Sequence, residues 1–281
     1  MAGEEAGEAA AEDSVAVALV ASAVVEDSRA AAQAAIGDAH MAKMTLEELV
    51  AQLRAAYGAE LRTVVLYGSA AAGEHIANRS DYNVLVIVDS LALERLRAAA
   101  AVAHAWGEAG NPAPLTLTTS EWRGSADIFP MEYADILERH KVLYGTPPFD
   151  DVHVEKRDLR LQLELETMSK LLRLRQAILA SGGDEKRQVE LLERSLSAIM
   201  IVFRAVMRLH GEVPSTDNRE LVKRVAQLAG IEGAAFDRVV RHVRREQTLA
   251  PADAGSVLSG YLEGMQRLVS HLDAFAVTDG R

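Results

Sequence analysis

The sequence of 281 residues contains no cysteine. This absence excludes disulfide bonds, thiolate zinc sites, iron–sulfur clusters and a cysteine nucleophile. A membrane-spanning run is also missing near the start, because the longest apolar stretch there, Val15–Val25, has eleven residues and a bilayer span needs about 20. Acidic residues precede this stretch, where a secretory signal would carry positive charge. We therefore expect a cytoplasmic protein with no membrane partner.

Positive charge is scarce as well. The chain has 30 Lys and Arg against 41 Asp and Glu, which gives a net charge of −11. Residues 1–40 hold eight acidic residues and one basic residue, so the rest of the chain carries only −4. This distribution argues against an extended nucleic-acid surface, because phosphate backbones bind to clustered Lys and Arg. A small local site for a nucleotide is compatible with it.

Composition and periodicity divide the chain into three parts. Residues 1–40 are rich in alanine and acidic residues and contain no aromatic residue, so we expect a disordered extension with little to bury. Residues 41–149 alternate between helical and strand periodicity, which indicates an α+β domain. Residues 150–277 show helical periodicity alone, which indicates an all-α helical bundle.

Local signals place the elements of the α+β domain. Thr45 and Glu48 have the spacing of a capping box, which predicts a helix that ends at Gly58. Asp89 or Ser90 is the expected cap of the next helix. Short β-branched apolar runs predict the strands. The expected strands are 63–67, 82–88 and 115–119, with a further short run at 142–144, and the expected later helices are 91–108 and 130–139.

The helical part is expected to contain five helices. Ser181-Gly-Gly183 separates the first two, and Asp217 with Glu220 forms a predicted capping box for the third. The expected ranges are 152–181, 184–210, 217–230, 234–247 and 251–275.

One stretch carries chemistry beyond fold formation. Gly68 and Ser69 directly follow the first predicted strand, and Asp81 stands at the start of the second after eleven intervening residues. Gly68 has no Cβ, so a phosphate can approach its backbone. Ser69 can donate its hydroxyl and N–H to that phosphate, and a helix over 70–74 would point its N-terminal N–H groups at it. Asp81 could then hold a magnesium ion that bridges the phosphates.

This arrangement resembles the nucleotidyltransferase superfamily, which is typified by DNA polymerase β and kanamycin nucleotidyltransferase. The family signature is Gly-Ser followed, on the next strand, by Asp-x-Asp or Asp-x-Glu, and the matching residues here are Gly68-Ser69 and Asp81-Tyr82-Asn83. The resemblance implies a mixed sheet with helices, followed by a helical domain. It also implies a nucleoside triphosphate such as ATP as partner, phosphate binding by Gly68 and Ser69, and Mg²⁺ held together with the nucleotide by Asp81 and Asn83, which would be the catalytic residues.

Two departures from the family pattern concern catalysis. Asn83 occupies the position of the second carboxylate, and the strand 115–119, which should carry the third, has no acidic residue. Asn83 can bind Mg²⁺ through its amide oxygen but cannot act as a general base. Glu74, Glu121 and Asp127 are acidic residues that could substitute, and each could equally be a helix cap or a solvated charge.

Three further features have both a functional and a structural interpretation. Arg204 and His210 have the spacing of the Arg-x(4–6)-His motif of HEPN ribonucleases, but they also suit the last turn of a helix. Trp106 and Trp122 are expected in a core or in interdomain packing rather than stacked on a base. A basic cluster could form an anion-binding wall or a solvated helix face, and it comprises Arg238, Arg241, His242, Arg244 and Arg245.

The sequence therefore predicts a nucleotide-binding protein of the nucleotidyltransferase superfamily in which nucleotidyl transfer is weakened or lost. One alternative is an active Mg²⁺-dependent transferase that moves a nucleoside monophosphate to a hydroxyl of a small molecule or protein. A HEPN-type ribonuclease in the helical domain is another. The acceptor, any protein partner and the oligomeric state, including a homodimer, remain open.

Overall fold

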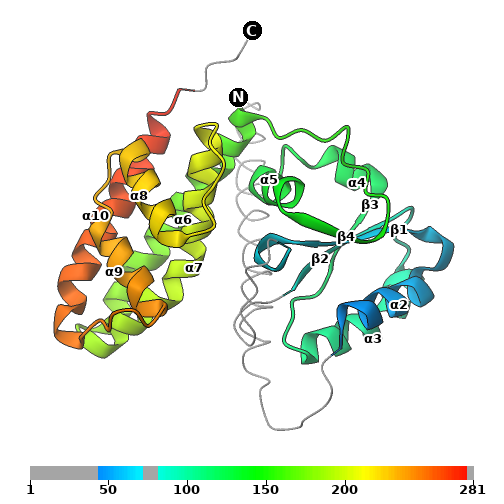
Figure 1. The fold of residues 1–281 in the computed structure, drawn as a ribbon, viewed down its shortest axis with the longest axis horizontal. Coiled ribbons are helices and arrows are strands. Elements are labelled where there is room, and N and C mark those ends of the chain that lie inside the picture. The colour runs from blue at the N-terminus through cyan, green and yellow to red at the C-terminus, as the bar shows by residue number, and fades with distance from the viewer. Residues whose placement is uncertain (1–43, 72–81, 277–281) are drawn as a thin grey trace, which may run out of the picture. The chain divides into compact units, whose positions relative to one another are not determined.

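The computed structural model describes residues 44–71 and 82–276. The predicted extension at 1–40 lies outside the described residues. The chain forms two compact units (Figure 1). One, which we call the sheet unit, comprises residues up to Ser125 together with Asp135–Val152, and the other, the helical unit, comprises Ala126–Ala134 and the chain from His153 onward. The fold is α+β, as predicted.

Four strands form one mixed sheet in the order β3-β2-β1-β4. They are β1 (Leu61–Tyr67), β2 (Asn83–Val88), β3 (Leu115–Thr118) and β4 (His140–Gly145). β1 is antiparallel to β2 and β4, whereas β2 and β3 are parallel. The central strands are almost wholly buried, which is typical of a sheet covered on both faces. The three predicted strands are confirmed, and the short run at 142–144 lies in β4.

Helices α2 (Leu46–Tyr57) and α3 (Leu93–Glu108) pack together on one face of the sheet, and α4 (Thr119–Gly124) lies on the other (Figure 1). The predicted capping box at the start of α2 is present, since the Thr45 and Glu48 side chains each accept the other's backbone N–H. The helix ends at Gly58, as predicted, and passes through the 3-10 turn η1 (Gly58–Glu60) into β1.

The predicted cap of α3 is wrong. The helix follows Ala92, which makes no side-chain capping hydrogen bond. Asp89 instead binds the guanidinium of Arg62 with both carboxylate oxygens, and the Ser90 hydroxyl donates to Glu60 Oε2 at 2.6 Å. Both candidate caps therefore fasten the end of β2 to the start of β1.

Two helices lie between β3 and β4. The sequence did not predict α4, which begins at its own capping box of Thr118 and Glu121. Helix α5 (Pro130–Glu138) begins at Pro130, as predicted. The boundary between the two units falls within α5, so its last residues belong to the sheet unit.

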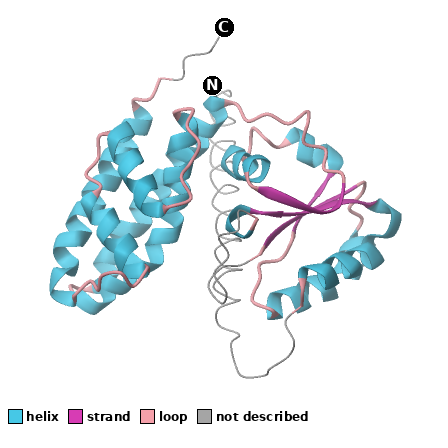
Figure 2. Cartoon of the chain, viewed as in Figure 1, coloured by secondary structure: helices cyan, strands magenta, loops and turns pink. Residues whose placement is uncertain are grey.

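The helical unit holds the five predicted long helices, and no strand occurs among its described residues (Figure 2). The helix that begins at Ala234 ends at Val243 rather than at 247. Arg245 has a φ of 61°, which a right-handed helix does not allow. Across residues 44–71 and 82–276, no helix has the length and apolar character of a membrane span. The helices are α6 (Lys156–Ser181), α7 (Glu185–Leu209), α8 (Asn218–Ala229), α9 (Ala234–Val243) and α10 (Ala254–Asp273), with the 3-10 turn η3 (Pro251–Asp253) before α10.

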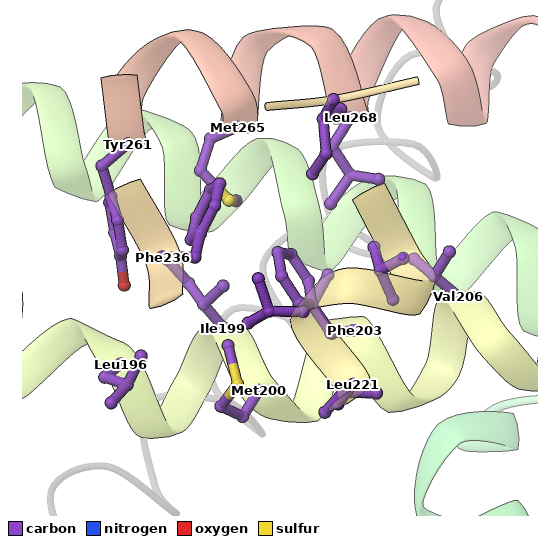
Figure 3. Packing of buried hydrophobic residues seen from close by; sticks show 14 of the residues in the cluster. Leu196, Ile199, Met200, Phe203, Val206, Leu221, Phe236, Tyr261, Met265 and Leu268 are labelled. Atoms are coloured by element: carbon purple, nitrogen blue, oxygen red, sulfur yellow. The ribbon is translucent and has the colours of Figure 1, made fainter. Parts of the chain in front are cut away.

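Aromatic side chains occupy the centre of this bundle (Figure 3). Phe236 of α9 lies between Phe203 of α7 and Tyr261 of α10, with ring centroids 5.1 and 4.4 Å away. Gly264 of α10 permits this packing, because a Cβ there would lie 2.4 Å from Phe236 Cε2. The three rings are fully buried, so the bundle has a core of its own.

Candidate functional site

The register of the sheet brings the end of β1 beside the starts of β2 and β4. Tyr67, the last residue of β1, pairs with Asn83 on one side and with His140 on the other. Gly68 follows with a φ of 75°, which favours glycine. Its N–H donates to the carbonyl of Arg139 at 3.1 Å, so this turn is fixed to the residue that follows α5.

Two polar side chains lie against Gly68. A Cβ built on this glycine would lie 3.4 Å from Asn83 Nδ2 and 3.6 Å from Asp135 Oδ2. Asp135 belongs to α5, and its Oδ1 accepts a hydrogen bond from Arg139 Nη2 at 2.6 Å. The side chains of Asp135 and Arg139 are 24% and 15% exposed. An amide and a carboxylate therefore lie beside Gly68, and a guanidinium holds that carboxylate.

The structure places the predicted site residues unequally. Gly68 and Asn83 lie side by side, and their roles in binding stay predictions. Ser69 belongs to the 3-10 turn η2 (Gly68–Ala70), where the sequence predicts the start of a helix over 70–74. Asp81 and Glu74 lie outside the described residues, so the pairing of Asp81 with Asn83 at a metal ion stays a prediction.

Glu121 and Asp127 do not belong to this group. Glu121 accepts the N–H of Thr118 at 2.7 Å and so completes the cap of α4. Asp127 is an exposed turn residue. Within the described part of the chain, no three His, Asp or Glu side chains are grouped closely enough to hold a metal ion.

Asp135 and Arg139 were not predicted from the sequence. Both lie far along the chain from Gly68, and the resemblance directs attention to strands rather than to α5. A local signal was present, because Asp and Arg four residues apart on a helix form an ion pair. That signal does not reveal the contact with Gly68, which depends on β4 pairing with β1.

Comparison with known proteins gives a structural match only. No protein-family model and no curated protein matches the chain. The solved structure of spectinomycin adenyltransferase AAD(9) from Enterococcus faecialis, with ATP and spectinomycin, superposes with a TM-score of 0.53 and 12% sequence identity, over 81% of this chain and 98% of that one. The chain has a nucleotidyltransferase-like fold. The identity is too low to transfer an activity.

The nucleotidyltransferase-like fold keeps both tryptophans in its core. Trp106 and Trp122 are fully buried, as predicted. Tyr82, whose ring centroid lies 6.1 Å from that of Trp106, also donates its N–H to Asn111 Oδ1 at 3.0 Å. These contacts fix the residue directly before Asn83, so the start of β2 is rigidly positioned.

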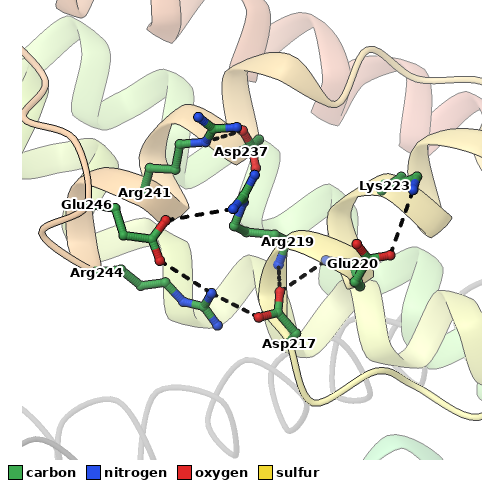
Figure 4. Close-up of polar contacts among 8 residues, drawn as sticks. All are labelled: Asp217, Arg219, Glu220, Lys223, Asp237, Arg241, Arg244 and Glu246. Atoms are coloured by element: carbon green, nitrogen blue, oxygen red, sulfur yellow. Dashed lines mark hydrogen bonds and ion pairs between the residues drawn. The ribbon is translucent and has the colours of Figure 1, made fainter.

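Basic side chains of α9 and of the residues after it lie against carboxylates of the helical unit. Arg241 pairs with Asp237 at 2.7 Å and Arg244 with Asp217 at 2.9 Å (Figure 4). Arg238 pairs with Asp253, and His242 lies 2.8 Å from Glu193. Arg219 joins the network through Asp237 and Glu246. These pairs support a structural role and give the anion-binding wall no support.

The ribonuclease candidates also have structural partners. Arg204 Nη2 donates to Asn218 Oδ1 at 3.2 Å. His210, at the C-cap of α7, forms a 3.1 Å hydrogen bond between its Nε2 and that of His271 in α10. Burial and the neighbouring His271 lower the pKa of His210. Both side chains connect helices of the bundle, which is the structural interpretation of this motif.

Proposed function

We propose that the protein binds a nucleoside triphosphate such as ATP, together with Mg²⁺, at the Gly68 end of β1, and that nucleotidyl transfer is weakened or lost. One observation carries the proposal. In a nucleotidyltransferase-like fold, Gly68 has a positive φ and is flanked by Asn83 and by the pair of Asp135 and Arg139. A glycine turn whose neighbouring carboxylate is held by a guanidinium is suited to phosphate.

Each predicted residue has a chemical role in this proposal. Ser69 would donate its hydroxyl to a phosphate, and Asp81 and Asn83 would supply oxygen ligands to Mg²⁺. Bound Mg²⁺ would neutralise phosphate charge. The Gly68 N–H is already donated to Arg139, so the phosphate must use the other donors of this turn. The described strands β2 and β3 contain no carboxylate to act as general base, which is why we expect transfer to be weak.

The second candidate is an active transferase with an acceptor hydroxyl. The observation in its favour is that the match covers 98% of a chain whose structure holds both ATP and spectinomycin. The acceptor hydroxyl would lose its proton and bond to the α-phosphorus of Mg·NTP, and pyrophosphate would leave from the nucleotide. Either function requires a compartment with nucleoside triphosphates, which is consistent with the predicted cytoplasmic location.

Isothermal calorimetry with ATP tests the proposal, in Mg²⁺ and then in EDTA. We expect saturable binding that weakens when Mg²⁺ is removed. Asp81→Ala should weaken the Mg²⁺-dependent part, whereas Asp89→Asn, at the other end of β2, should leave binding unchanged. No binding at millimolar ATP would refute the proposal. Transfer of label from α-labelled ATP to an acceptor would favour the second candidate over the first.

A further inference from the structure

The carboxylate missing from the strands has a counterpart on a helix. β2 begins with Asn83, and the sequence of β3 is Leu-Thr-Leu-Thr. Asp135 reaches the same place from α5, because Arg139 directly precedes β4 and its carbonyl accepts the Gly68 N–H. The pairing of β4 with β1 thus brings one turn of α5 to the end of β1.

An amide and a carboxylate side chain flank Gly68. The missing Cβ would stand 3.4 Å from the Asn83 amide nitrogen and 3.6 Å from Asp135 Oδ2, so these two groups flank the space that a side chain would fill. A half-turn of the amide presents Asn83 Oδ1 in place of Nδ2. Carboxylate and amide oxygens are the protein ligands that Mg²⁺ and Mn²⁺ use.

We propose that Asp135 supplies from α5 the carboxylate that β2 and β3 lack, and that with Asn83 it holds the nucleotide-bound divalent cation beside Gly68. This inference rests on the proposed function, because Mg²⁺ would arrive with the triphosphate. It differs from the family pattern, in which strands carry the carboxylates.

Arg139 completes the arrangement. Its guanidinium holds Asp135 Oδ1 at 2.6 Å and is only 15% exposed, so the carboxylate is oriented and its charge is balanced without a ligand. Guanidinium groups also form charge-assisted bonds with phosphate. Arg139 is therefore a positioning residue for Asp135 and a partner for the phosphate that accompanies the cation.

Mn²⁺ binding measured by electron paramagnetic resonance in the presence of ATP tests the proposal without an activity assay. Asp135→Asn removes the charge but keeps an oxygen that can accept the Arg139 hydrogen bond. We expect its Mn²⁺ affinity to fall at least about tenfold. Asp89→Asn is the matched control, because Asp89 also pairs with an arginine of the sheet unit, and its Mn²⁺ affinity should equal that of the wild type.

A second variant keeps the proposal testable if Asp135→Asn does not fold. The chain has no cysteine, so Asp135→Cys introduces a single thiolate, which binds Cd²⁺ strongly. With ATP present, titration with Cd²⁺ should produce the ultraviolet charge-transfer band of a cadmium thiolate. Asp89→Cys should produce none at the same concentration.

The outcomes separate this inference from the proposed function. Lost Mn²⁺ binding in Asp135→Asn, or a cadmium band specific to Asp135→Cys, supports the inference. Wild-type Mn²⁺ affinity in Asp135→Asn, or equal bands in the two cysteine variants, overturns it while nucleotide binding stands. A wild-type protein that binds neither ATP nor Mn²⁺ with ATP refutes the proposed function and the inference together.

Discussion

The two units use their arginines in different ways. In the helical unit, arginines of the basic cluster pair with carboxylates of α9 itself and of neighbouring elements of the same unit. In the sheet unit, Arg139 and Asp135 form a half-buried pair beside a glycine with positive φ and an amide side chain. The basic cluster in the sequence thus forms ion pairs within the helical unit. Arg139, which does not belong to a basic cluster, lies at the candidate site.

A similar contrast exists within the sheet unit. Arg62 and Asp89 pair at the opposite end of β1 and β2, with side chains 56% and 41% exposed. Exposed ion pairs contribute about 0–1 kcal/mol. The less exposed pair of Asp135 and Arg139 lies beside Asn83 and a glycine with positive φ. The two Asp–Arg pairs therefore differ in their surroundings, although their chemistry is the same.

A substitution at Gly145 should change stability more than any other variant considered, because it disturbs packing and not the binding site. Gly145, which pairs with Thr63, has a φ of 72°, and a Cβ there would lie 1.9 Å from the carbonyl oxygen of Arg62. We expect Gly145→Ala to lower the free energy of unfolding by about 3–5 kcal/mol, from backbone strain and overpacking. Gly182→Ala is the control, because Gly182 has a positive φ and open space around it, and should cost about 1–2 kcal/mol. Equal losses in urea unfolding would contradict the packing account.

Gly68→Ala should lower stability only modestly but should lower ATP affinity strongly. Its Cβ would meet Asn83 and Asp135 only at contact distance, so we expect a stability loss close to that of Gly182→Ala, about 1–2 kcal/mol. The methyl group would fill the space where phosphate and cation approach. We therefore expect ATP affinity in Mg²⁺ to fall at least about tenfold, or about 1.4 kcal/mol, by calorimetry. Unchanged affinity would place the nucleotide elsewhere.

A third test asks whether the basic network takes part in binding. The double variant Arg241→Gln, Arg244→Gln removes two charges whose partners are carboxylates of the helical unit. We expect a stability loss of about 1 kcal/mol or less, because these side chains are partly exposed, and no change in ATP affinity. A marked loss of ATP affinity would support the anion-binding role of the basic cluster. The two units would then not differ in how they use their arginines.

The smallest expected effect is on pH dependence. Burial and His271 lower the pKa of His210, Arg224 and Lys156 lower it further, and Glu212 opposes them. Burial also lowers the pKa of His271. Below the ordinary value of about 6.5, the unfolded chain binds these protons before the folded chain does. Stability is therefore fully present above this pH and falls as the pH drops toward the lowered folded values.

Thermal unfolding between pH 7.5 and 5 tests this effect. His271→Gln removes the second imidazole, so we expect a shallower decline in Tm with falling pH than in the wild type. His104→Gln is the control, because His104 is 78% exposed on α3, and should keep the wild-type slope. A slope unaffected by His271→Gln would show that other groups dominate the acid response.

Features that depend on residues close together in the chain could be predicted from the sequence. The Thr45 and Glu48 capping box and the β-branched runs of β1 and β2 lie within a few residues, and each appears in the structure. The predicted cap of α3 was wrong because Asp89 pairs instead with Arg62, which lies 27 residues earlier in the chain. Asp135 was missed for the same kind of reason, since its contact with Gly68 depends on the pairing of strands distant in sequence.

Calorimetric titration of the full chain with ATP, in Mg²⁺ and in EDTA, measures whether the protein binds a nucleoside triphosphate with a divalent cation. We expect saturable binding that is clearly weaker in EDTA and is weakened further by Gly68→Ala. If no saturable binding is found at millimolar ATP under either condition, the proposed site at the Gly68 end of β1 does not exist.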